Sequence, residues 1–274
     1  MDACSLIITT LGRKRELARL LESLVAQQEK PCQVILVDQN PKGYLADIVE
    51  PFFGMLPLTL LNTEPKGVSA ARNLGLPYVT GDIVAFPDDD CWYLPNTLER
   101  VVVLFNEFPE LGGLVVSWAE RPFASGFQEG LEPVTHINAF RRAGTLVQFY
   151  RREVLDGVAY DPLLGPGTGL PYGCGEDTDF LLQVLEKGHI VRRTAEVLVG
   201  HPEPDTLDQK LVPKIHAYAR GRMHLLRKHK FSFWFKLANI FYPLGCLLRE
   251  NPRTWRYRKA MFWGRLKAFF SSVN

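Results

Sequence analysis

The sequence predicts an α/β protein in which a mostly parallel sheet is flanked by helices. Over the first two-thirds of the 274-residue chain, short apolar or β-branched runs alternate with stretches of helical periodicity. Such alternation is typical of parallel strands joined by right-handed helical crossovers. The composition, 46% hydrophobic and 23% charged, is that of a globular protein and excludes disordered and fibrous classes.

Each predicted element follows from the spacing of its apolar residues. Strands are assigned where β-branched and aliphatic residues run together, and helices where apolar residues recur every three or four positions, as leucines do in the first helix. The predicted strands are Ser5–Thr10, Gln33–Val37, Leu58–Leu61, Asp82–Phe86, Leu114–Trp118, Ile190–Arg192 and Val197–Val199. The predicted helices are Arg15–Gln27, Tyr44–Phe53, Gly67–Leu76, Pro95–Phe108 and Asp177–Lys187. The stretch from Arg121 to Gly175 is rich in glycine, proline and aromatic residues, so we expect functional loops there.

Charge divides the chain into two parts. Residues 1–204 hold 17 basic and 27 acidic residues, whereas residues 205–274 hold 15 basic and 3 acidic ones. We therefore expect a catalytic domain over residues 1–204 and a basic, amphipathic helical segment over residues 205–274 that faces an anionic partner. The five cysteines are widely spread and form no C-x-x-C pair, which argues against disulfides or zinc and favours the cytosol. The N-terminus lacks the pattern of a signal peptide.

Three consecutive aspartates, Asp88, Asp89 and Asp90, follow the predicted fourth strand. Side chains alternate along a strand, so Asp88 and Asp90 are expected to project together while Asp89 points away. Two neighbouring carboxylates repel each other unless a cation or a proton joins them, and a hard divalent ion prefers such oxygen ligands. The alternative is a solvated acidic turn, because aspartate is common in loops.

A second acidic cluster, Glu176-Asp177-Thr178-Asp179, opens a predicted helix behind Gly175. Acids at a helix N-terminus often cap free N–H groups and complement the helix dipole. Three acids are more than a cap needs, however, so one carboxylate is a candidate general base for an acceptor hydroxyl.

Further candidates lie in loops at the same predicted edge of the sheet. Thr10 and Arg13 belong to the first such loop, and Asp38 ends the second strand, where it either contacts a nucleobase or ribose or starts a turn. Gly67 lets the backbone approach a ligand closely, and Arg72 suits a phosphate. Together these loops predict a nucleotide site.

In this order, the motifs resemble those of family 2 glycosyltransferases with the GT-A fold. The resemblance covers most of residues 5–200 and rests on Thr10…Arg13, Val37-Asp38, Gly67-Val68-Ser69-Ala70-Ala71-Arg72-Asn73, Phe86-Pro87-Asp88-Asp89-Asp90 and Gly175-Glu176-Asp177. It implies a Rossmann-like GT-A domain, followed here by a helical C-terminal segment. It also implies a nucleotide-sugar donor and Mn²⁺ or Mg²⁺ as cofactor.

The resemblance also assigns roles. Asp88 and Asp90 fall on the D-x-D motif that contacts the nucleotide and its metal, and Asp177 falls on the base, with Glu176 as its neighbour. The remaining predicted donor-binding residues are Thr10, Arg13, Asp38, Gly67, Arg72 and Asp89. His201 follows the last predicted strand, where GT-A enzymes often place a metal-ligating histidine; a structural histidine is the alternative.

Two positions depart from the family pattern. Gln39-Asn40-Pro41 stands where the family commonly has Asp-Gly-Ser, which bears on the base contacts, and Cys91-Trp92 follows the aspartate triplet, which leaves the D-x-D spacing intact.

The C-terminal segment mixes aromatic and basic residues. An apolar run from Phe231 to Leu248 approaches the length of a membrane span, but Lys236 and Pro243 argue against one. Between Trp255 and Phe270 aromatic and basic residues interleave along a predicted helix, which suits an anionic membrane surface. The alternatives are a helical cap on the catalytic body and nucleic-acid binding; no nucleic-acid fold motif accompanies the charge, so we expect no nucleic-acid partner.

We therefore predict an inverting, metal-dependent glycosyltransferase that moves a sugar from a UDP-sugar or similar donor to a hydroxyl of a saccharide or lipid-linked acceptor. Inversion and a bacterial surface-polysaccharide role are implied by the resemblance. The expected location is the cytoplasm, peripheral on the inner face of the membrane. The rival interpretations are a nucleotidyltransferase, whose usual glycine-rich loop is missing after Thr10, and a non-catalytic scaffold that retains the fold.

Overall fold

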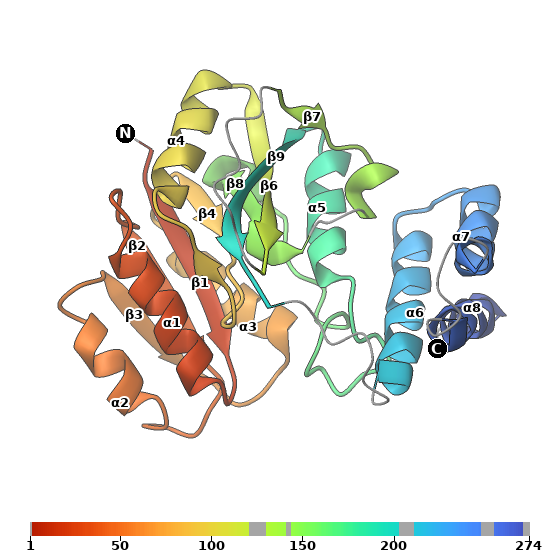
Figure 1. Ribbon diagram of the computed structural model, residues 1–274, viewed down its shortest axis with the longest axis horizontal. Coiled ribbons are helices and arrows are strands. Elements are labelled where there is room, and N and C mark those ends of the chain that lie inside the picture. Colours follow the sequence, from red (N-terminus) through yellow and green to blue (C-terminus); the bar gives the residue numbers. More distant parts are fainter. Residues whose placement is uncertain (1, 121–129, 141–143, 203–210, 248–254, 271–274) are drawn as a thin grey trace.

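The computed structural model describes residues 2–120, 130–140, 144–202, 211–247 and 255–270. Within these ranges, a nine-stranded mixed sheet forms the larger body, and three C-terminal helices lie beside it (Figure 1). The strands are β1 Cys4–Thr10, β2 Gln33–Asp38, β3 Leu58–Asn62, β4 Ile83–Ala85, β5 Trp92–Tyr93, β6 Leu111–Ala119, β7 Glu132–Pro133, β8 Gln148–Arg151 and β9 Ile190–Gly200. The helices are α1 Lys14–Val25, α2 Ala46–Val49, α3 Val68–Gly75, α4 Thr97–Glu107, α5 Glu176–Glu186, α6 Leu211–Lys228, α7 Phe233–Cys246 and α8 Trp255–Phe270.

The sheet is parallel in one half and mixed in the other. Its order is β3-β2-β1-β4-β8-β6-β9-β5, with β7 also paired to β9. Strands β3, β2, β1 and β4 are parallel neighbours, as the alternating sequence predicted. In the other half, β8 runs antiparallel between β4 and β6, and β9 is parallel to β6 but antiparallel to β5. The predicted α/β fold is thus confirmed, with a mixed second half.

Three element assignments need correction. The two short strands predicted at Ile190–Arg192 and Val197–Val199 are one strand, β9, whose pairing with β6 shifts register along its length. The helix predicted at Tyr44–Phe53 is only the short α2 followed by a 3-10 turn at Glu50–Phe52, where Pro51 cannot continue α-helical hydrogen bonding. The long loop region contains β7 and β8, while residues 121–129 and 141–143 lie outside the described ranges.

The core explains why the first half forms as predicted. All seven residues of β1 and five of the six in β2 are buried, as expected for parallel strands covered on both faces. The periodic leucines of α1 are completely buried against the sheet. They are Leu17, Leu20, Leu21 and Leu24.

The C-terminal helices pack on one another and on α5. Met223, Leu226, Ile240 and Ala268 form a small separate core between α6, α7 and α8. On the side of α5, the buried Asp179 joins the end of α6 through ion pairs described below. The predicted boundary between residues 204 and 205 falls outside the described ranges. Among the described helices, none combines the length and the apolar character that crossing a membrane requires.

Candidate active site

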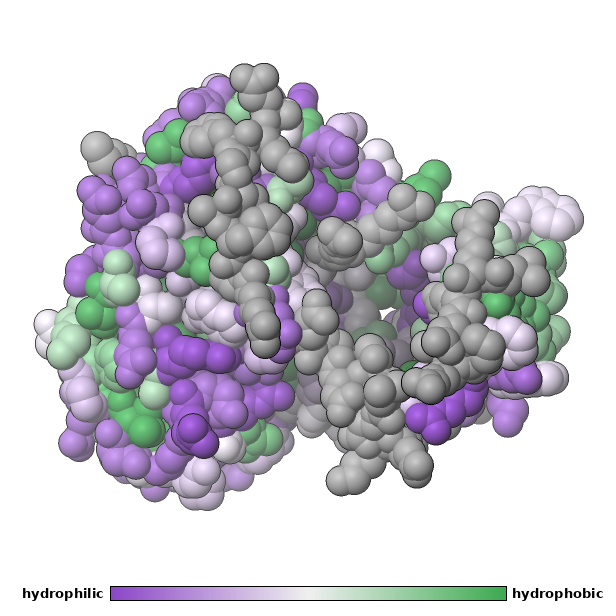
Figure 2. All heavy atoms as spheres, viewed as in Figure 1, coloured by the Kyte–Doolittle hydropathy of each residue, from purple (hydrophilic) through white to green (hydrophobic). Residues whose placement is uncertain are grey.

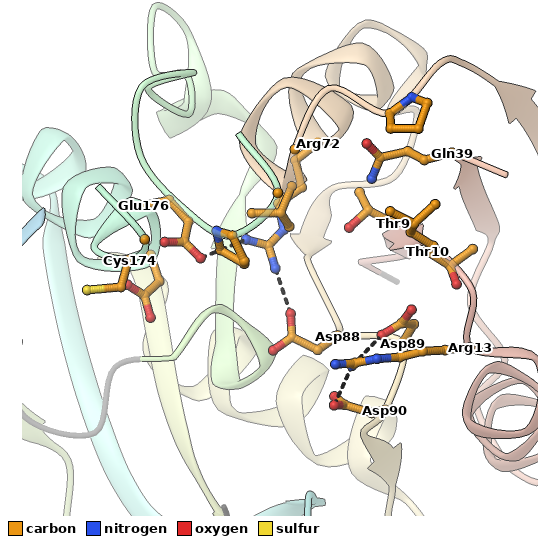
Figure 3. Close-up of a pocket in the computed structure, with 18 of the residues that line it drawn as sticks. Thr9, Thr10, Arg13, Gln39, Arg72, Asp88, Asp89, Asp90, Cys174 and Glu176 are labelled. Atoms are coloured by element: carbon orange, nitrogen blue, oxygen red, sulfur yellow. Dashed lines mark hydrogen bonds and ion pairs between the residues drawn. The ribbon is translucent and has the colours of Figure 1, made fainter. Parts of the chain in front are cut away.

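A cavity of about 510 Å³ opens at the carboxyl edge of the parallel strands (Figure 3). Loops that follow β1, β2 and β4 form one side, and the start of α5, the residue after β9 and one residue of α6 form the other. This is the position at which α/β sheets commonly bind ligands. Of the predicted site residues, all but Asp38 line it.

The aspartate triplet is fixed by two arginines. Asp88 pairs in parallel register with Thr9 of β1, which places the triplet beside the end of that strand. Nη2 of Arg72 donates to Oδ1 of Asp88 at 2.6 Å. Nη1 of Arg13 donates to both Asp89 and Asp90, as Figure 3 shows. Asp89 and Asp90 thus share Arg13, whereas Asp88 is held by Arg72, and all three aspartates line the cavity.

Asp88, Asp90 and His201 form a candidate metal site. Each offers one ligand atom, and these atoms lie within 4.8 Å of one another. Nε2 of His201 is 3.2 Å from Oδ1 of Asp90, and Nδ1 of His201 is buried without a hydrogen-bond partner among the described residues. The two carboxylates are ligands that suit Mn²⁺ and Mg²⁺, whereas the imidazole nitrogen is typical of transition-metal sites.

The pKa values of these groups reflect burial first and neighbouring charges second. Burial raises the pKa of Asp88 although Arg72 lies beside it, and burial raises the pKa of Asp89 to about 6 against the opposing charge of Arg13. For Asp90, burial acts in the same direction, but the hydrogen bond with His201 and the charge of Arg13 outweigh it and lower the pKa. Burial likewise acts to lower the pKa of His201, but Asp90 and Asp88 raise it overall. The imidazole therefore compensates part of the acidic charge.

Arg72 is a buried cation between the two acidic clusters. Its side chain is only 2% exposed, and besides the bond to Asp88 its Nη1 lies 4.0 Å from Oε1 of Glu176. The guanidinium also lies 5.1 Å from the ring centroid of Tyr160. Burial opposes its charge, but Tyr160 and the surrounding carboxylates raise its pKa overall. Arg72 therefore stays charged and stabilises the ionised acids on both sides.

The second acidic cluster starts α5, as predicted. Burial and then the charge of Asp177 raise the pKa of Glu176 to about 8. Burial also raises the pKa of Asp177, although its Oδ1 accepts a 2.7 Å hydrogen bond from the N–H of Thr178. That bond favours the charged form of Asp177, and a pKa of about 8 leaves Glu176 mostly protonated near neutral pH.

Other predicted donor-site residues have varied surroundings. Asp38 is buried, and its carboxylate accepts from Asn40 and from Asn62, so its neighbour Gln39 lines the cavity instead. Gly67 has a φ of 84°, and a Cβ there would lie 2.9 Å from Thr168. The glycine thus allows close approach of the opposite loop.

Sequence reasoning missed Gln39, Cys174 and Tyr218 as cavity residues. In the sequence, Gln39 stands out only as a departure from the family pattern; in the structure, its Oε1 accepts from the backbone N–H of Lys66. Tyr218 belongs to α6, in the segment that was assigned to membrane contact. No local signal in the sequence places an α6 residue at the cavity.

The N-terminal half of the chain matches a known family. Residues 5–144 match the family described as Glycosyl transferase family 2. An uncharacterized glycosyltransferase of Haemophilus influenzae is 32% identical over 108 residues, which are 39% of this chain and 36% of that protein. A glucosyl-dolichyl phosphate glucuronosyltransferase of Haloferax volcanii is 33% identical over 126 residues, which are 43% of this chain and 40% of that protein. These matches span less than half the length of either relative.

Solved structures share the fold over nearly the whole chain. The 1–349 fragment of S. aureus TarS in complex with UDP-GlcNAc superposes with a TM-score of 0.65, covering 97% of this chain and 81% of that one at 15% identity. The mannosyltransferase PcManGT of Pyrobaculum calidifontis, in complex with GDP-Man and Mn²⁺, gives a TM-score of 0.63 over 97% and 73% at 17% identity. The chain therefore has the GT-A type of fold.

Proposed function

This chain belongs to glycosyltransferase family 2, and from that premise we propose that it moves a sugar from a nucleotide-diphosphate sugar to a hydroxyl of a saccharide or lipid-linked acceptor. A UDP-sugar is the first candidate donor. One observation supports the proposal most strongly. The triad Asp88, Asp90 and His201 opens onto the same cavity as Glu176 and Asp177.

The metal-binding role falls to the triad. Asp88, Asp90 and His201 would hold Mn²⁺ or Mg²⁺, because their ligand atoms are close enough for one ion and the acids otherwise repel each other. When bound, the ion neutralises negative charge that develops on the diphosphate leaving group. PcManGT, which shares the fold, was solved with GDP-Man and Mn²⁺. Gln39 and the loop after β1 are the proposed nucleotide end of the cavity.

The base is proposed to be Asp177. It takes the proton of the acceptor hydroxyl, whose oxygen attacks the anomeric carbon on the face opposite the diphosphate. The bond from that carbon to the diphosphate oxygen breaks, and its electron pair leaves with the nucleoside diphosphate. A single displacement of this kind inverts the anomeric centre. Glu176, protonated near neutral pH, keeps the pair from carrying two adjacent charges.

Product analysis tests the proposal against its rivals. With a UDP-sugar and Mn²⁺, the protein is expected to release UDP, and Asp177→Asn is expected to slow that release by a factor of about 10²–10⁴ while still binding the donor. Release of pyrophosphate would identify a nucleotidyltransferase. Tight donor binding without turnover of any acceptor or of water would favour a non-catalytic scaffold. A thermal-shift screen of nucleotide sugars with Mn²⁺ identifies the donor to use.

Membrane attachment is a separate proposal, with the protein peripheral on the inner face. Large aromatic side chains of α7 are exposed, among them Trp234 at 73% and Phe241 at 50%. Removing the C-terminal segment is a poor test, because Tyr218 of α6 lines the active-site cavity. Flotation with anionic liposomes should instead compare the intact chain with Trp234→Ser and Phe241→Ser. Equal recovery of all three proteins would contradict membrane contact through α7.

A further inference from the structure

A second cavity, of about 520 Å³, lies where α6, α7 and α8 meet the 3-10 turn Asn138–Phe140. It shares Cys174 and Tyr218 with the active-site cavity, so the two are neighbours separated by one wall. Much of the remaining lining is apolar or aromatic and includes Phe140 and Phe235. Nothing in the proposed donor chemistry uses this space.

Two arginines line this cavity and donate to the same residue. Arg222 of α6 donates through Nε and Nη2 to Oδ1 of Asn239 at 3.2 and 3.1 Å, and Arg265 of α8 donates to the carbonyl oxygen of the same residue. Within the described ranges, neither guanidinium pairs with a carboxylate, and Nε of Arg265 is buried without a hydrogen-bond partner. No carboxylate is among the residues that line this cavity, although the charge of Asp177 in the neighbouring cavity acts to raise the pKa of Arg222.

Burial of two like charges is unfavourable unless something compensates them. Burial, with a contribution from Arg265, lowers the pKa of Arg222 to about 9, and burial, with a contribution from Arg258, lowers that of Arg265 to about 10. Both therefore remain charged at neutral pH. The guanidinium carbon of Arg222 lies 3.4 Å from the ring centroid of Phe140, which stabilises only part of this charge. An anion with several oxygens, such as a phosphate, would accept hydrogen bonds from the guanidinium N–H groups that Asn239 does not occupy.

The apolar lining continues onto the outside of α7. Tyr242 lines the cavity and is also 64% exposed, and Phe241 beside it is 50% exposed. On the face drawn in Figure 2, hydrophobic and hydrophilic residues lie side by side over α7 and α8. A free phosphate ion gains nothing from contact with an apolar surface, whereas a hydrocarbon chain attached to the phosphate would bury apolar area against it.

We propose that this second cavity is the acceptor subsite, and that it binds the phosphate of a lipid-linked acceptor between Arg222 and Arg265 with the lipid chain along α7. The inference rests on the proposed function, because the bound molecule is the acceptor of that transfer. Because Cys174 and Tyr218 line both cavities, a sugar attached to this phosphate would lie next to the cavity that Asp177 lines.

Binding to phosphatidylcholine vesicles that carry a few mole per cent of farnesyl phosphate tests this with the intact chain. Vesicles with farnesol in its place report binding to the lipid without the phosphate. Hydrogen bonds to charged groups contribute about 1.5–3 kcal/mol each, so Arg222→Gln and Arg265→Gln should each weaken binding roughly ten- to hundredfold. Lys259→Gln removes the same charge from an exposed position on α8 outside the cavity and should leave binding nearly unchanged. Equal losses for all three variants would reduce the effect to surface charge and overturn the proposal.

Further measurements distinguish a loss of binding from a loss of folding. Arg265→Lys retains the charge and should recover part of the binding, and melting curves identify any variant that is unfolded. On the unmodified chain, inorganic pyrophosphate should compete with farnesyl phosphate, but with much weaker affinity. Equal affinities would mean a free phosphate site and refute the lipid.

Titration with UDP and Mn²⁺ on the same samples separates the two proposals. If the unmodified chain does not bind UDP but does bind farnesyl phosphate, the proposed function is overturned and the anion site remains. Intact nucleotide binding without any preference for farnesyl phosphate over farnesol would overturn this inference alone.

Discussion

Replacing Arg72 with methionine is the most informative single change in the active site. The substitution keeps an unbranched apolar stem in a fully enclosed position and removes the charge between the two acidic clusters. Asp88 then loses a 2.6 Å ion pair, and Glu176 loses a cation 4.0 Å away. Asp177, whose pKa Arg72 also lowers, is affected through the same loss.

The expected size of the effect follows from burial. Removing one partner of a buried ion pair typically destabilises a protein by about 3–5 kcal/mol. The Asp88 side chain is 33% exposed, so solvent screening places the expected loss near the lower limit, about 3 kcal/mol. Arg72 opposes the burial that raises the pKa of Asp88, Glu176 and Asp177, so its removal raises all three further. The ionised base then forms only at higher pH, and the acidic limb of kcat/KM must move upward.

Two measurements on a matched pair of variants check this. Arg100→Met serves as control, because Arg100 pairs with Glu196 at 2.7 Å and does not line the cavity. Urea unfolding should show destabilisation of both variants, but the pH profile of turnover should shift only for Arg72→Met. A profile with an unmoved acidic limb in a folded Arg72→Met would refute the electrostatic role assigned to this arginine.

Three further predictions follow from the same cavity. Asp177→Asn should lower kcat by a factor of about 10²–10⁴, with donor affinity in calorimetry retained. Glu176→Gln imitates an acid that is already protonated and should retain more activity. The reverse ranking of the two variants would exchange the roles of the two residues. His201→Gln should weaken Mn²⁺ binding measured by electron paramagnetic resonance, and full activity in EDTA would contradict any metal role. Gly67→Ala should destabilise the protein more than Gly188→Ala, because both have a φ of 84° but only a Cβ at Gly67 meets a neighbour, and equal losses in urea unfolding would show that the contact is unimportant.

The first half of the fold was predictable because its signals are local. Strands buried on both faces are uninterrupted apolar runs, and the leucines of α1 repeat at helical spacing. The edge of the sheet that carries the site followed from the same pattern, since the ends of parallel strands meet. The sequence therefore predicts that Arg13, Arg72 and the aspartate triplet converge, as their hydrogen bonds show.

The second half was less predictable because its pairing is non-local. Strand β8 has four residues within a region rich in glycine and proline, and its place between β4 and β6 depends on partners far away in sequence. The position of Tyr218 was unpredictable for the same reason, because this residue lines the cavity only through the packing of α6 against the body. For Asp38, the sequence predicts the position but not the hydrogen-bond partners. Its position was right, but Asn40 and Asn62 occupy its carboxylate, and only the fold reveals that.

The structure also links the C-terminal helices to the catalytic chemistry. Oδ2 of the buried Asp179, one residue after Thr178 in α5, pairs with Nζ of Lys228 at 2.8 Å, and its Oδ1 pairs with Nε2 of His229 at 2.8 Å. The first turn of α5 carries the proposed base, so the helix that presents Asp177 is fixed from behind by residues at the end of α6. Hydrogen bonds with Asp179 and Glu186 raise the pKa of His229 against the effect of burial. The stabilisation that His229 contributes is therefore fully present below its ordinary pKa of 6.5 and is lost as pH rises through the higher folded value. A segment that sequence alone assigns to membrane contact therefore also helps to position the catalytic helix.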